Sequence, residues 1–372
     1  MSHQLLTVNS GSTSVKLALY ESGPGGALTR QSAQQHSGEA LDPQAVLGAL
    51  KSKLAVAPAV IAHRIVHGGT RFVQPTRVDS AVIAAIEELS PLAPLHNPAA
   101  VRWLKAAREL WGTGTSQVAV FDTAYFARLP RVAAEYALPA RLGVDQGVRR
   151  YGFHGLAHES MWHSWCRLYP ELPQGGRLIT LQLGGGCSIA AIDRGRPVDV
   201  SMGFSPLEGL VMATRSGDVD PAIIPHLQRR LSLSSEEIVA LLNEASGLAG
   251  VSGSDANPAS LLADASPQAQ FAVELYCYRI RKYLGAYFAV LGGCDGIVFG
   301  GGVGEHTPGV RSRALAGLEW AGLGLDPALN EAARGGDARL SAARSAVRVH
   351  VIAPDEELVL ARAAAALTET RS

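Results

Sequence analysis

Two arginines stand at positions where a guanidinium group is costly unless it meets an anion. Arg64 lies inside the apolar segment A-H-R-I-V-H-G-G-T, which starts at Ala62, and Arg215 lies in the glycine-jointed segment T-R-S-G-D. The donor fork of arginine fits a carboxylate or a phosphoryl group. Arg64 is therefore a candidate anion-binding residue, with a structural pair to a buried carboxylate as the open alternative.

Acidic and histidine side chains supply further candidates. Asp122 directly follows the apolar run Gln117–Phe121, and ligands of open α/β sheets bind at the carboxyl ends of strands. A magnesium ligand, a general base and a helix cap all remain possible roles for it. His154 lies in Y-G-F-H-G-L-A-H, but its spacing to His158 lacks the third ligand of a zinc site. P-D-E-E-L, from Pro354, places carboxylates where the last helix begins, which the helix dipole also favours.

Three turns rich in small residues could approach a phosphate. N-S-G-S-T-S-V-K, from Asn9, and L-G-G-G, from Leu183, each separate two β-prone runs, while G-G-G-V-G-E-H follows a third. Such turns offer backbone N–H groups to anions. Ser14 can be laid on Ser188, 174 positions later, which is close to half the chain. This predicts a duplicated α/β domain with one phosphate hairpin in each half.

The elements that would position these residues alternate between strand-like and helix-like patterns, which favours an α/β fold. We expect capped helices from Asp79, Asn97 and Ser234, a long helix at 268–291 and a final helix at 357–368. Strands are expected at 5–8, 15–20, 60–66, 117–121, 178–183, 188–193, 296–299 and 347–352.

Bulk composition limits the class of protein. The 372 residues carry no formal net charge, so nothing favours nucleic acid or an anionic membrane as a partner. Four cysteines are scattered without a C-x-x-C pair, and no segment is long and apolar enough for a membrane span. We therefore expect a soluble cytoplasmic protein of two domains.

Taken together, the motifs resemble the acetate kinase (acetokinase) family of the actin/sugar kinase/Hsp70 superfamily. N-S-G-S-T-S-V-K, H-R-I-V-H-G-G, F-D-T-A-Y, Y-G-F-H-G, T-R-S-G-D-V-D-P and D-E-E-L occur in the order that the family shows. The resemblance implies an α/β fold of two duplicated actin/Hsp70/sugar-kinase-like (ribonuclease H-like) domains with a cleft between them. It implies domains at 1–126 plus 358–372 and at 127–357, and a homodimer.

The resemblance also implies a reaction, the reversible in-line transfer of a phosphoryl group between ATP and acetate, giving acetyl phosphate and ADP. Mg²⁺ would be the metal, with Mn²⁺ as an alternative. Because acetate is ionised at pH 7, it needs no base, so we expect Asp122 to orient magnesium or its water.

Residue roles follow by position in the matching motifs. The catalytic residues would be Arg64, which also takes the substrate carboxylate, Asp122, His154 and Arg215. Asn9 and Glu356 would hold the metal. The apolar pocket around the acetate methyl group would consist of Val66, Leu95, Phe153 and Pro206. The phosphates and the nucleotide would be bound by Lys16, Gln182, Leu183, Gly184, Gly185, Gly186, Asn257, Pro258, Ala259, Gly302, Val303, Gly304, Glu305 and His306.

The sequence departs from the family pattern on the side of the phosphoryl donor. Q-L-G-G-G-C-S, which includes Cys187, replaces H-L-G-N-G-S-S, N-P-A replaces D-[FM]-R with Asp255 nearby, and G-E-H replaces G-E-N. Two hypotheses stay open: ordinary use of ATP with altered contacts, or a changed donor such as GTP, pyrophosphate or polyphosphate.

Two other classes of protein and one other substrate are alternatives to an acetate kinase. A sugar kinase would need a polar sugar pocket, against which the apolar pocket residues argue, and an actin-like or chaperone ATPase would have no organised carboxylate site, against which Arg64 argues. The small pocket favours acetate or propionate over longer acids.

Overall fold

The computed structural model describes residues 3–11, 14–38 and 41–369, which form two compact units. Unit 1 contains the described residues of Met1–Ala127, Phe153–Ser160 and Asp355–Ser372, and unit 2 contains Arg128–Gly152 and Met161–Pro354. The sequence-based division differs, because it assigned Ala127, 153–160 and 355–357 to the second domain. Ser12 and Thr13 of the first hairpin lie outside the described residues.

Unit 1 is built on a six-stranded sheet of order β3-β2-β1-β4-β6-β5. β1, β4 and β6 run parallel, while β2, β3 and β5 are antiparallel to their neighbours. The carboxyl ends of the three parallel strands therefore meet at one edge of the sheet. The strands are β1 (His3–Ser10), β2 (Ser14–Ser22), β3 (Leu28–Ser37), β4 (Val60–Ile65), β5 (Thr76–Arg77) and β6 (Ser116–Phe121).

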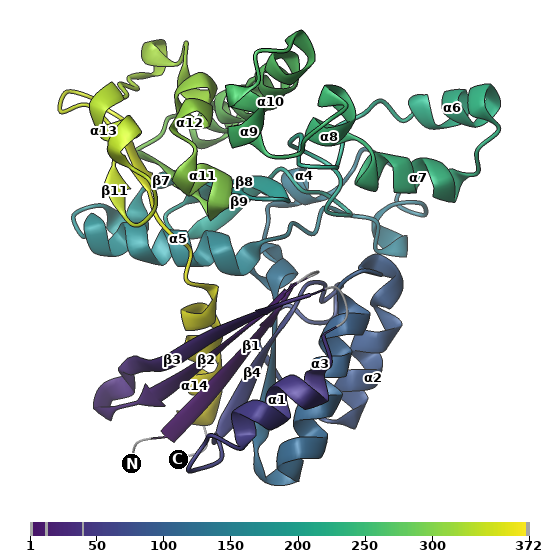
Figure 1. Ribbon diagram of the computed structural model, residues 1–372, viewed down its shortest axis with the longest axis vertical. Helices are drawn as coiled ribbons and strands as arrows, with labels where there is room; N and C mark the ends of the chain where they lie inside the picture. Colours follow the sequence, from purple (N-terminus) through teal and green to yellow (C-terminus); the bar gives the residue numbers. More distant parts are fainter. Residues whose placement is uncertain (1–2, 12–13, 39–40, 370–372) are drawn as a thin grey trace. The chain divides into compact units, whose positions relative to one another are not determined.

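Helices cover both faces of this sheet because strand side chains alternate between its faces (Figure 1). Leu6 and Ile61 pack against α1 (Pro43–Lys51) and α3 (Asn97–Trp111), which α2 (Ser80–Glu88) adjoins. Leu5 and Ala62 face α14 (Glu356–Glu369) on the other side. Asp79 caps α2 as predicted, since its side chain accepts a hydrogen bond from the N–H of Val82 at 2.8 Å.

The expected capping role of Asn97 is wrong. The helix α3 begins at Asn97, its N-cap position is His96, and no side chain caps it. Asn97 is fully buried and instead bonds the backbone of His67, whose N–H donates to Asn97 Oδ1 at 3.2 Å and whose carbonyl accepts from Nδ2 at 3.0 Å. This side chain therefore fixes the loop after β4.

Unit 2 repeats the sheet of unit 1. Its order is β9-β8-β7-β10-β12-β11, with β7, β10 and β12 parallel and the other strands antiparallel to their neighbours. Strand for strand, this is the topology of unit 1, which confirms the predicted duplication. The strands are β7 (Arg177–Leu183), β8 (Cys187–Asp193), β9 (Arg196–Val200), β10 (Gly296–Gly300), β11 (Ala338–Arg339) and β12 (Arg348–Val351).

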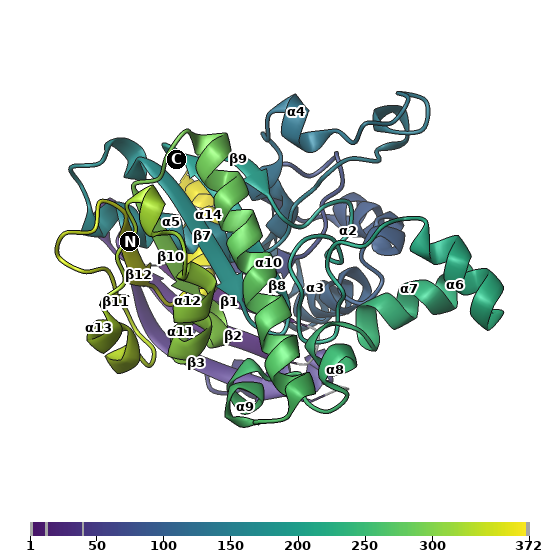
Figure 2. The same ribbon diagram turned by 90° about the horizontal axis from the view of Figure 1, so that it is seen from above.

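A long helix, α10 (Pro267–Leu291), crosses the strands β7, β8 and β9 in unit 2 (Figure 2). Ser266 caps its start, and Gly292, left-handed at φ 65°, caps its end. Ser234 and Glu237 form the predicted capping box of α7. The remaining helices are α4 (Arg131–Ala134), α5 (Gly155–Leu168), α6 (Ile223–Leu231), α7 (Ser235–Glu244), α8 (Gly247–Ser252), α9 (Pro258–Ala263), α11 (Gly301–His306), α12 (Pro308–Leu315) and α13 (Pro327–Ala332).

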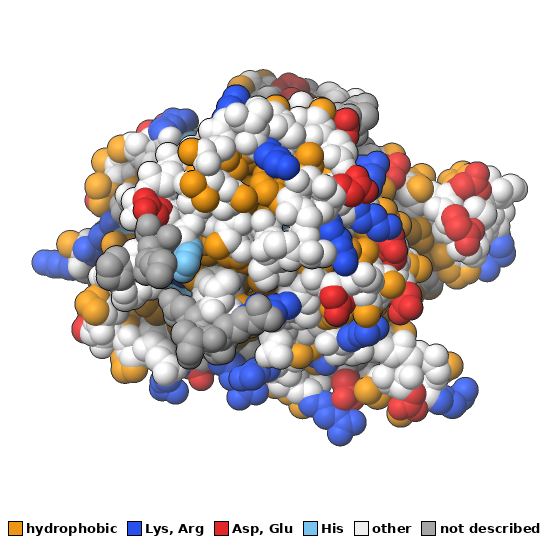
Figure 3. Space-filling model, turned by 90° about the horizontal axis from the view of Figure 1, so that it is seen from below, with side chains coloured by type: hydrophobic (Ala, Val, Ile, Leu, Met, Phe, Trp, Pro, Cys, Tyr) orange, Lys and Arg blue, Asp and Glu red, His pale blue; other side chains and the backbone are white. Residues whose placement is uncertain are grey.

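The surface agrees with the balanced composition. On the face in Figure 3, side chains of both charge signs are interspersed, without a large block of one sign. Among the described helices, none combines the length and the apolar character that crossing a bilayer requires.

Buried histidines should make the fold sensitive to acid. Burial lowers the pKa of His63 to about 3, an effect that its hydrogen bond with Gln117 opposes, and burial lowers the pKa of His67 and of His350 to about 4. The unfolded chain binds protons on these groups below about pH 6.5, whereas the folded chain does not. The free energy of unfolding is therefore fully retained above pH 6.5. It falls as the pH drops toward 4, by up to about 1.4 kcal/mol per pH unit for each of these histidines.

Urea unfolding between pH 7 and 4.5 measures this slope. We expect His63→Leu to reduce it by about 1.4 kcal/mol per pH unit. The matched control is His226→Gln, which removes an exposed histidine. An unchanged slope in His63→Leu would show that His63 titrates alike in the folded and unfolded states.

Candidate active site

Three polar residues meet where the parallel strands of unit 1 end. Asn9 lies near the end of β1, Arg64 near the end of β4, and Asp122 directly after β6. Arg64 donates to Asp122 Oδ2 from Nη2 at 2.7 Å and from Nε at 3.1 Å. The predicted alternative for Arg64, a buried carboxylate partner, is thus present, and the partner is itself a candidate site residue.

The first residues of α14 complete this cluster. Glu356 Oε2 lies 3.6 Å from Arg64 Nη1. Asn9 donates from Nδ2 to Glu356 Oε2 and to Glu357 Oε1, both at 2.8 Å, and its Oδ1 accepts from Arg64 Nη1 at 3.2 Å. We call Asn9, Arg64, Asp122 and Glu356 the polar cluster. Sequence reasoning did not single out Glu357, although it lies in the same D-E-E-L motif.

The two carboxylates of the polar cluster compete for one guanidinium. Burial raises the pKa of Asp122 although Arg64 opposes the effect, because the side chain is only 1% exposed. For Glu356, burial also acts to raise the pKa, but Arg64, the hydrogen bond from Asn9, His154 and Lys16 together lower it. Glu356 is therefore ionised at neutral pH, and Asp122 would gain from another nearby cation.

The donor set fits a magnesium ion. Asp122 Oδ1 is buried and accepts no hydrogen bond from the described residues, so an acceptor is left open there. The oxygens of Asn9, Asp122 and Glu356 are the hard ligands that Mg²⁺ prefers, and Mg²⁺ usually keeps several waters beside one or two carboxylates. In the described part of the chain, no cluster of three or more His, Cys, Asp or Glu side chains could hold a metal by itself.

His154 has an unusual backbone beside the polar cluster. Its φ is 58°, in the left-handed region, and it directly precedes α5. A Cβ on the next residue, Gly155, would lie 1.9 Å from the carbonyl oxygen of Asp122. Only glycine permits this approach, so Gly155 lets the backbone beside His154 pack against Asp122, the residue after β6.

The residues predicted for the acetate methyl pocket differ in exposure. Val66 and Phe153 are buried in unit 1, where the ring of Phe153 meets that of His67 at a centroid distance of 5.6 Å. Leu95, in the turn before α3, is 62% exposed. Pro206 belongs to unit 2, where its carbonyl accepts a hydrogen bond from Arg215 at 3.2 Å.

Arg215 in unit 2 is partly buried, and none of the described residues supplies it with a counter-anion. Its Nη1 reaches the carbonyl of Pro206 and, at 3.8 Å, the sulfur of Met212, and no carboxylate of the described residues pairs with it. Burial lowers the pKa of this guanidinium. A partly buried cation that lacks an anion favours binding one.

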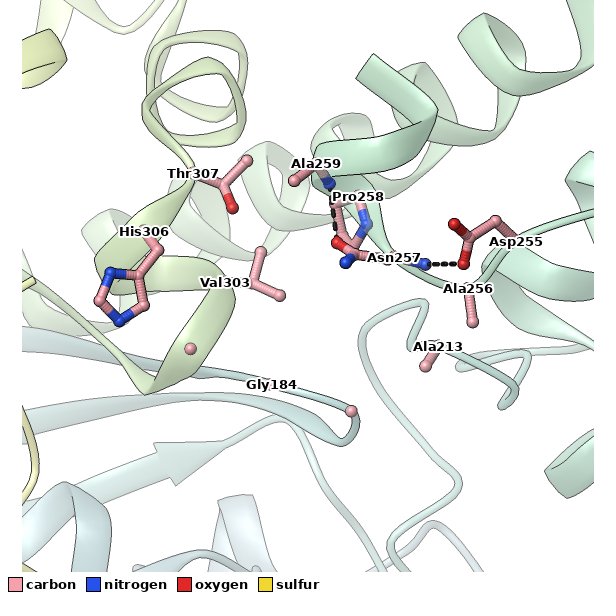
Figure 4. Close-up of a pocket in the computed structure, with 12 residues that line it drawn as sticks. Gly184, Ala213, Asp255, Ala256, Asn257, Pro258, Ala259, Val303, His306 and Thr307 are labelled. Atoms are coloured by element: carbon pink, nitrogen blue, oxygen red, sulfur yellow. Dashed lines mark hydrogen bonds between the residues drawn. The ribbon is translucent and has the colours of Figure 1, made fainter. Parts of the chain in front are cut away.

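Unit 2 also contains a cavity of about 470 Å³ between the β7–β8 turn and the first residues of α9 and α11 (Figure 4). Eight of the predicted nucleotide residues line it: Gly184, Gly185, Asn257, Pro258, Ala259, Gly302, Val303 and His306. Ala213, Asp255, Ala256 and Thr307 also line it. Three of these, Ala213, Ala256 and Thr307, carried no functional signal in the sequence.

The other predicted nucleotide residues do not line this cavity. Lys16 belongs to unit 1, and the remaining ones are Gln182, Leu183, Gly186, Gly304 and Glu305. Leu183 is fully buried in the core. Gln182 keeps a buried Oε1 that no described residue donates to.

The glycine segment after β10 forms the helix α11 rather than the turn that the sequence predicted. Gly301 starts α11 with φ 77°, and a Cβ there would lie 2.5 Å from the carbonyl oxygen of Leu183. Packing therefore explains Gly301. A Cβ on Gly302 would meet nothing within 4 Å, so this residue leaves space beside the cavity.

A fully buried arginine, Arg311 of α12, holds α11 in place. Its donors reach the carbonyls of Gly304 and Glu305 at 2.8 and 2.9 Å, both carbonyl and side-chain oxygens of Asn330, and the carbonyl of Ala333. It thereby joins the C-terminal ends of α11 and α13, where the helix dipoles favour a cation. Burial lowers its pKa to about 10.

Replacing Arg311 by methionine should leave these buried oxygens unpaired. We expect the free energy of unfolding to fall by about 3 kcal/mol or more. Urea unfolding of Arg311→Met and of the exposed Arg313→Met from the same helix measures the difference. Equal losses in the two variants would contradict a central role for Arg311.

Comparisons with known proteins agree with these features. The model of the acetokinase family matches residues 31–362. The acetate kinase of Clavibacter sepedonicus is 47% identical over 315 residues, which cover 84% of this chain and 79% of that protein. The crystal structure of Porphyromonas gingivalis acetate kinase has a TM-score of 0.86 at 34% identity, covering 98% of this chain and 100% of that one.

A propionate kinase from Francisella tularensis is also similar, with a TM-score of 0.85 at 30% identity over 97% of this chain and 98% of its own. The family model covers most of the chain, and the two solved structures match 98% and 97% of it. The chain therefore belongs to the acetokinase family.

Proposed function

We propose that the protein is an acetate kinase, which transfers the γ-phosphoryl group of ATP directly to acetate and catalyses the reverse reaction. The observation that carries this proposal is the guanidinium of Arg64 at the carboxyl edge of the sheet, with buried Val66 two positions along the chain and buried Phe153 in ring contact with His67. A cation beside a small apolar surface suits a short carboxylate. Membership of the acetokinase family supports the same reaction.

In this proposal the polar residues offset the electrostatic repulsion between a carboxylate and a polyanionic phosphate. Arg64 binds the acetate carboxylate, while Arg215 and His154 stabilise the charge of the transferring phosphoryl group. Lys16 contributes positive charge near the phosphates. Because acetate is already ionised, no residue has to remove a proton from it.

Asn9 and Glu356 would hold Mg²⁺, or Mn²⁺, and Asp122 would orient the metal or its water. The ion supplies positive charge that offsets the phosphate repulsion. The cavity residues of unit 2 would bind ATP or ADP. We further propose that the enzyme is a homodimer, which light scattering after gel filtration would test.

Asp122→Asn should lose about 10- to 100-fold in kcat, part of which a raised Mg²⁺ concentration restores. The reason is that the variant keeps the shape of the side chain but loses the charge whose oxygen Oδ1 is open in the structure. Turnover is measured across a Mg²⁺ series, with Asp79→Asn at the N-cap of α2 as the matched control. A loss that no Mg²⁺ concentration changes would argue against a role at the metal.

The substrates are tested by combining donors with acceptors. ATP, GTP and pyrophosphate are each offered with acetate or propionate, and the acyl phosphate is trapped with hydroxylamine. We expect signal that requires both acetate and ATP. Propionate is the second candidate acceptor because a structural neighbour is named a propionate kinase. Signal independent of any carboxylic acid would contradict the proposal.

A further inference from the structure

The segment that carries Arg215 is a loop whose two ends are joined by Asp218. The N–H of Asp218 donates to the carbonyl of Gly209 at 3.1 Å, and the N–H of Gly209 donates to Asp218 Oδ1 at 2.8 Å. A Cβ on Gly217 would lie 2.5 Å from the carbonyl oxygens of Gly209 and Leu210. The ends of the loop 209–218 therefore approach so closely that glycine is required.

The middle of this loop is fixed by backbone contacts with α8. The N–H groups of Leu248 and Ala249 donate to the carbonyls of Met212 and Ala213, both at 2.9 Å. Within the loop, the N–H of Met212 donates to the carbonyl of Arg215 at 3.0 Å. The backbone of Arg215 is thus bonded to Met212, which α8 holds, whereas its side chain has no carboxylate partner among the described residues.

The second oxygen of Asp218 connects the loop to α10. Tyr283 donates to Asp218 Oδ2 at 2.9 Å, and Arg279 Nη1 lies 3.3 Å from the same atom. Tyr276, on the same face of the helix, places its hydroxyl 3.3 Å from the sulfur of Cys187, directly after the β7–β8 turn. One face of α10 therefore contacts both the Arg215 loop and the turn that lines the cavity.

We propose that Asp218, held by Tyr283, is a positioning residue that acts on phosphoryl transfer through Arg215. The proposal rests on the proposed function, because it assumes that Arg215 meets the transferring group. Since no described carboxylate fixes the guanidinium, its place depends on the loop, which α8 holds at its middle and the Asp218 clamp holds at its base. A displacement of about 1 Å at such a donor can cost about 100-fold in rate.

The test is a double-mutant cycle between the clamp and Arg215. Asp218→Asn and Tyr283→Phe should each lower kcat about 10- to 100-fold, with the KM for acetate unchanged. In the Arg215→Ala background the same changes should alter kcat by less than about twofold, because the residue through which they act is gone. Tyr278→Phe, an exposed tyrosine on α10, is the matched control and should have wild-type kcat.

Hydrogen exchange gives a second readout that does not depend on activity. Amides of 210–217 should exchange faster in Asp218→Asn and in Tyr283→Phe than in the wild type, and Tyr283→Phe serves if Asp218→Asn does not fold. Equal kcat losses with and without Arg215, or an unchanged kcat, overturn the proposal. Absence of acetate-dependent turnover in the wild type instead overturns the proposed function, whatever the exchange of the loop shows.

Discussion

Arg64→Ala is expected to lower kcat/KM for acetate by about 10²- to 10³-fold and to destabilise unit 1 as well. The catalytic loss follows from removing a preorganised donor to the carboxylate, worth about 3 kcal/mol of transition-state stabilisation. The loss of stability follows from the polar cluster, since Asp122 and Glu356 would stay buried without their shared cation. Breaking a buried pair in this way costs about 3–5 kcal/mol.

Steady-state kinetics and urea unfolding on the same preparations measure both effects. Arg71→Ala is the control, because it removes an arginine that also pairs with a carboxylate, Glu88 at 3.9 Å, but on the exposed surface. Arg64→Lys should recover part of the stability but less of the activity, since a lysine keeps the charge and loses the donor fork. Near-normal kcat/KM in Arg64→Ala would remove Arg64 from the mechanism.

Arg215→Ala is expected to show the opposite combination, a loss of about 10²- to 10³-fold in kcat with little change in stability. Arg215 is partly buried and, among the described residues, bonds a carbonyl and a sulfur but no carboxylate, so its removal leaves none of these carboxylates unpaired. Removing a desolvated cation that lacks a counter-anion costs the fold little.

The control for Arg215→Ala is Arg229→Ala, which removes an exposed arginine of α6 in the same unit. Arg215→Ala should unfold at a urea concentration close to that of this control while its kcat is far lower. A large fall in stability together with an unchanged kcat would show that Arg215 is structural.

Much of the fold follows from local sequence patterns. The paired runs around Gly11 and around Gly184–Gly186 predicted both hairpins, and their spacing predicted the duplication that the two sheets display. The strand β3 (Leu28–Ser37) was not predicted, because its sequence L-T-R-Q-S-A-Q-Q-H-S is polar and mostly exposed at the edge of the sheet. An edge strand with one neighbour is specified by pairing with that neighbour more than by its own apolar pattern.

Site residues that belong to a sequence motif were predictable. Residues whose place depends on contacts between distant parts of the chain were less so. Asn9 and Glu356 are 347 positions apart, and only the family resemblance brought them together before the structure showed their hydrogen bond. Arg311 resembles any surface arginine in the sequence, since its burial arises from carbonyls at the ends of two other helices. Likewise, Asn97 follows the local pattern of a cap, but the backbone of His67 competes for its side chain.

The origin of the bridging oxygen in acetyl phosphate tests the central claim most directly. Acetate labelled with ¹⁸O in both oxygens is incubated with ATP, and the product is analysed by ³¹P NMR. The proposed direct attack of the carboxylate on the γ-phosphorus predicts a phosphorus atom bonded to one ¹⁸O and release of ADP. A phosphorus without ¹⁸O, or label recovered in AMP, would contradict the account.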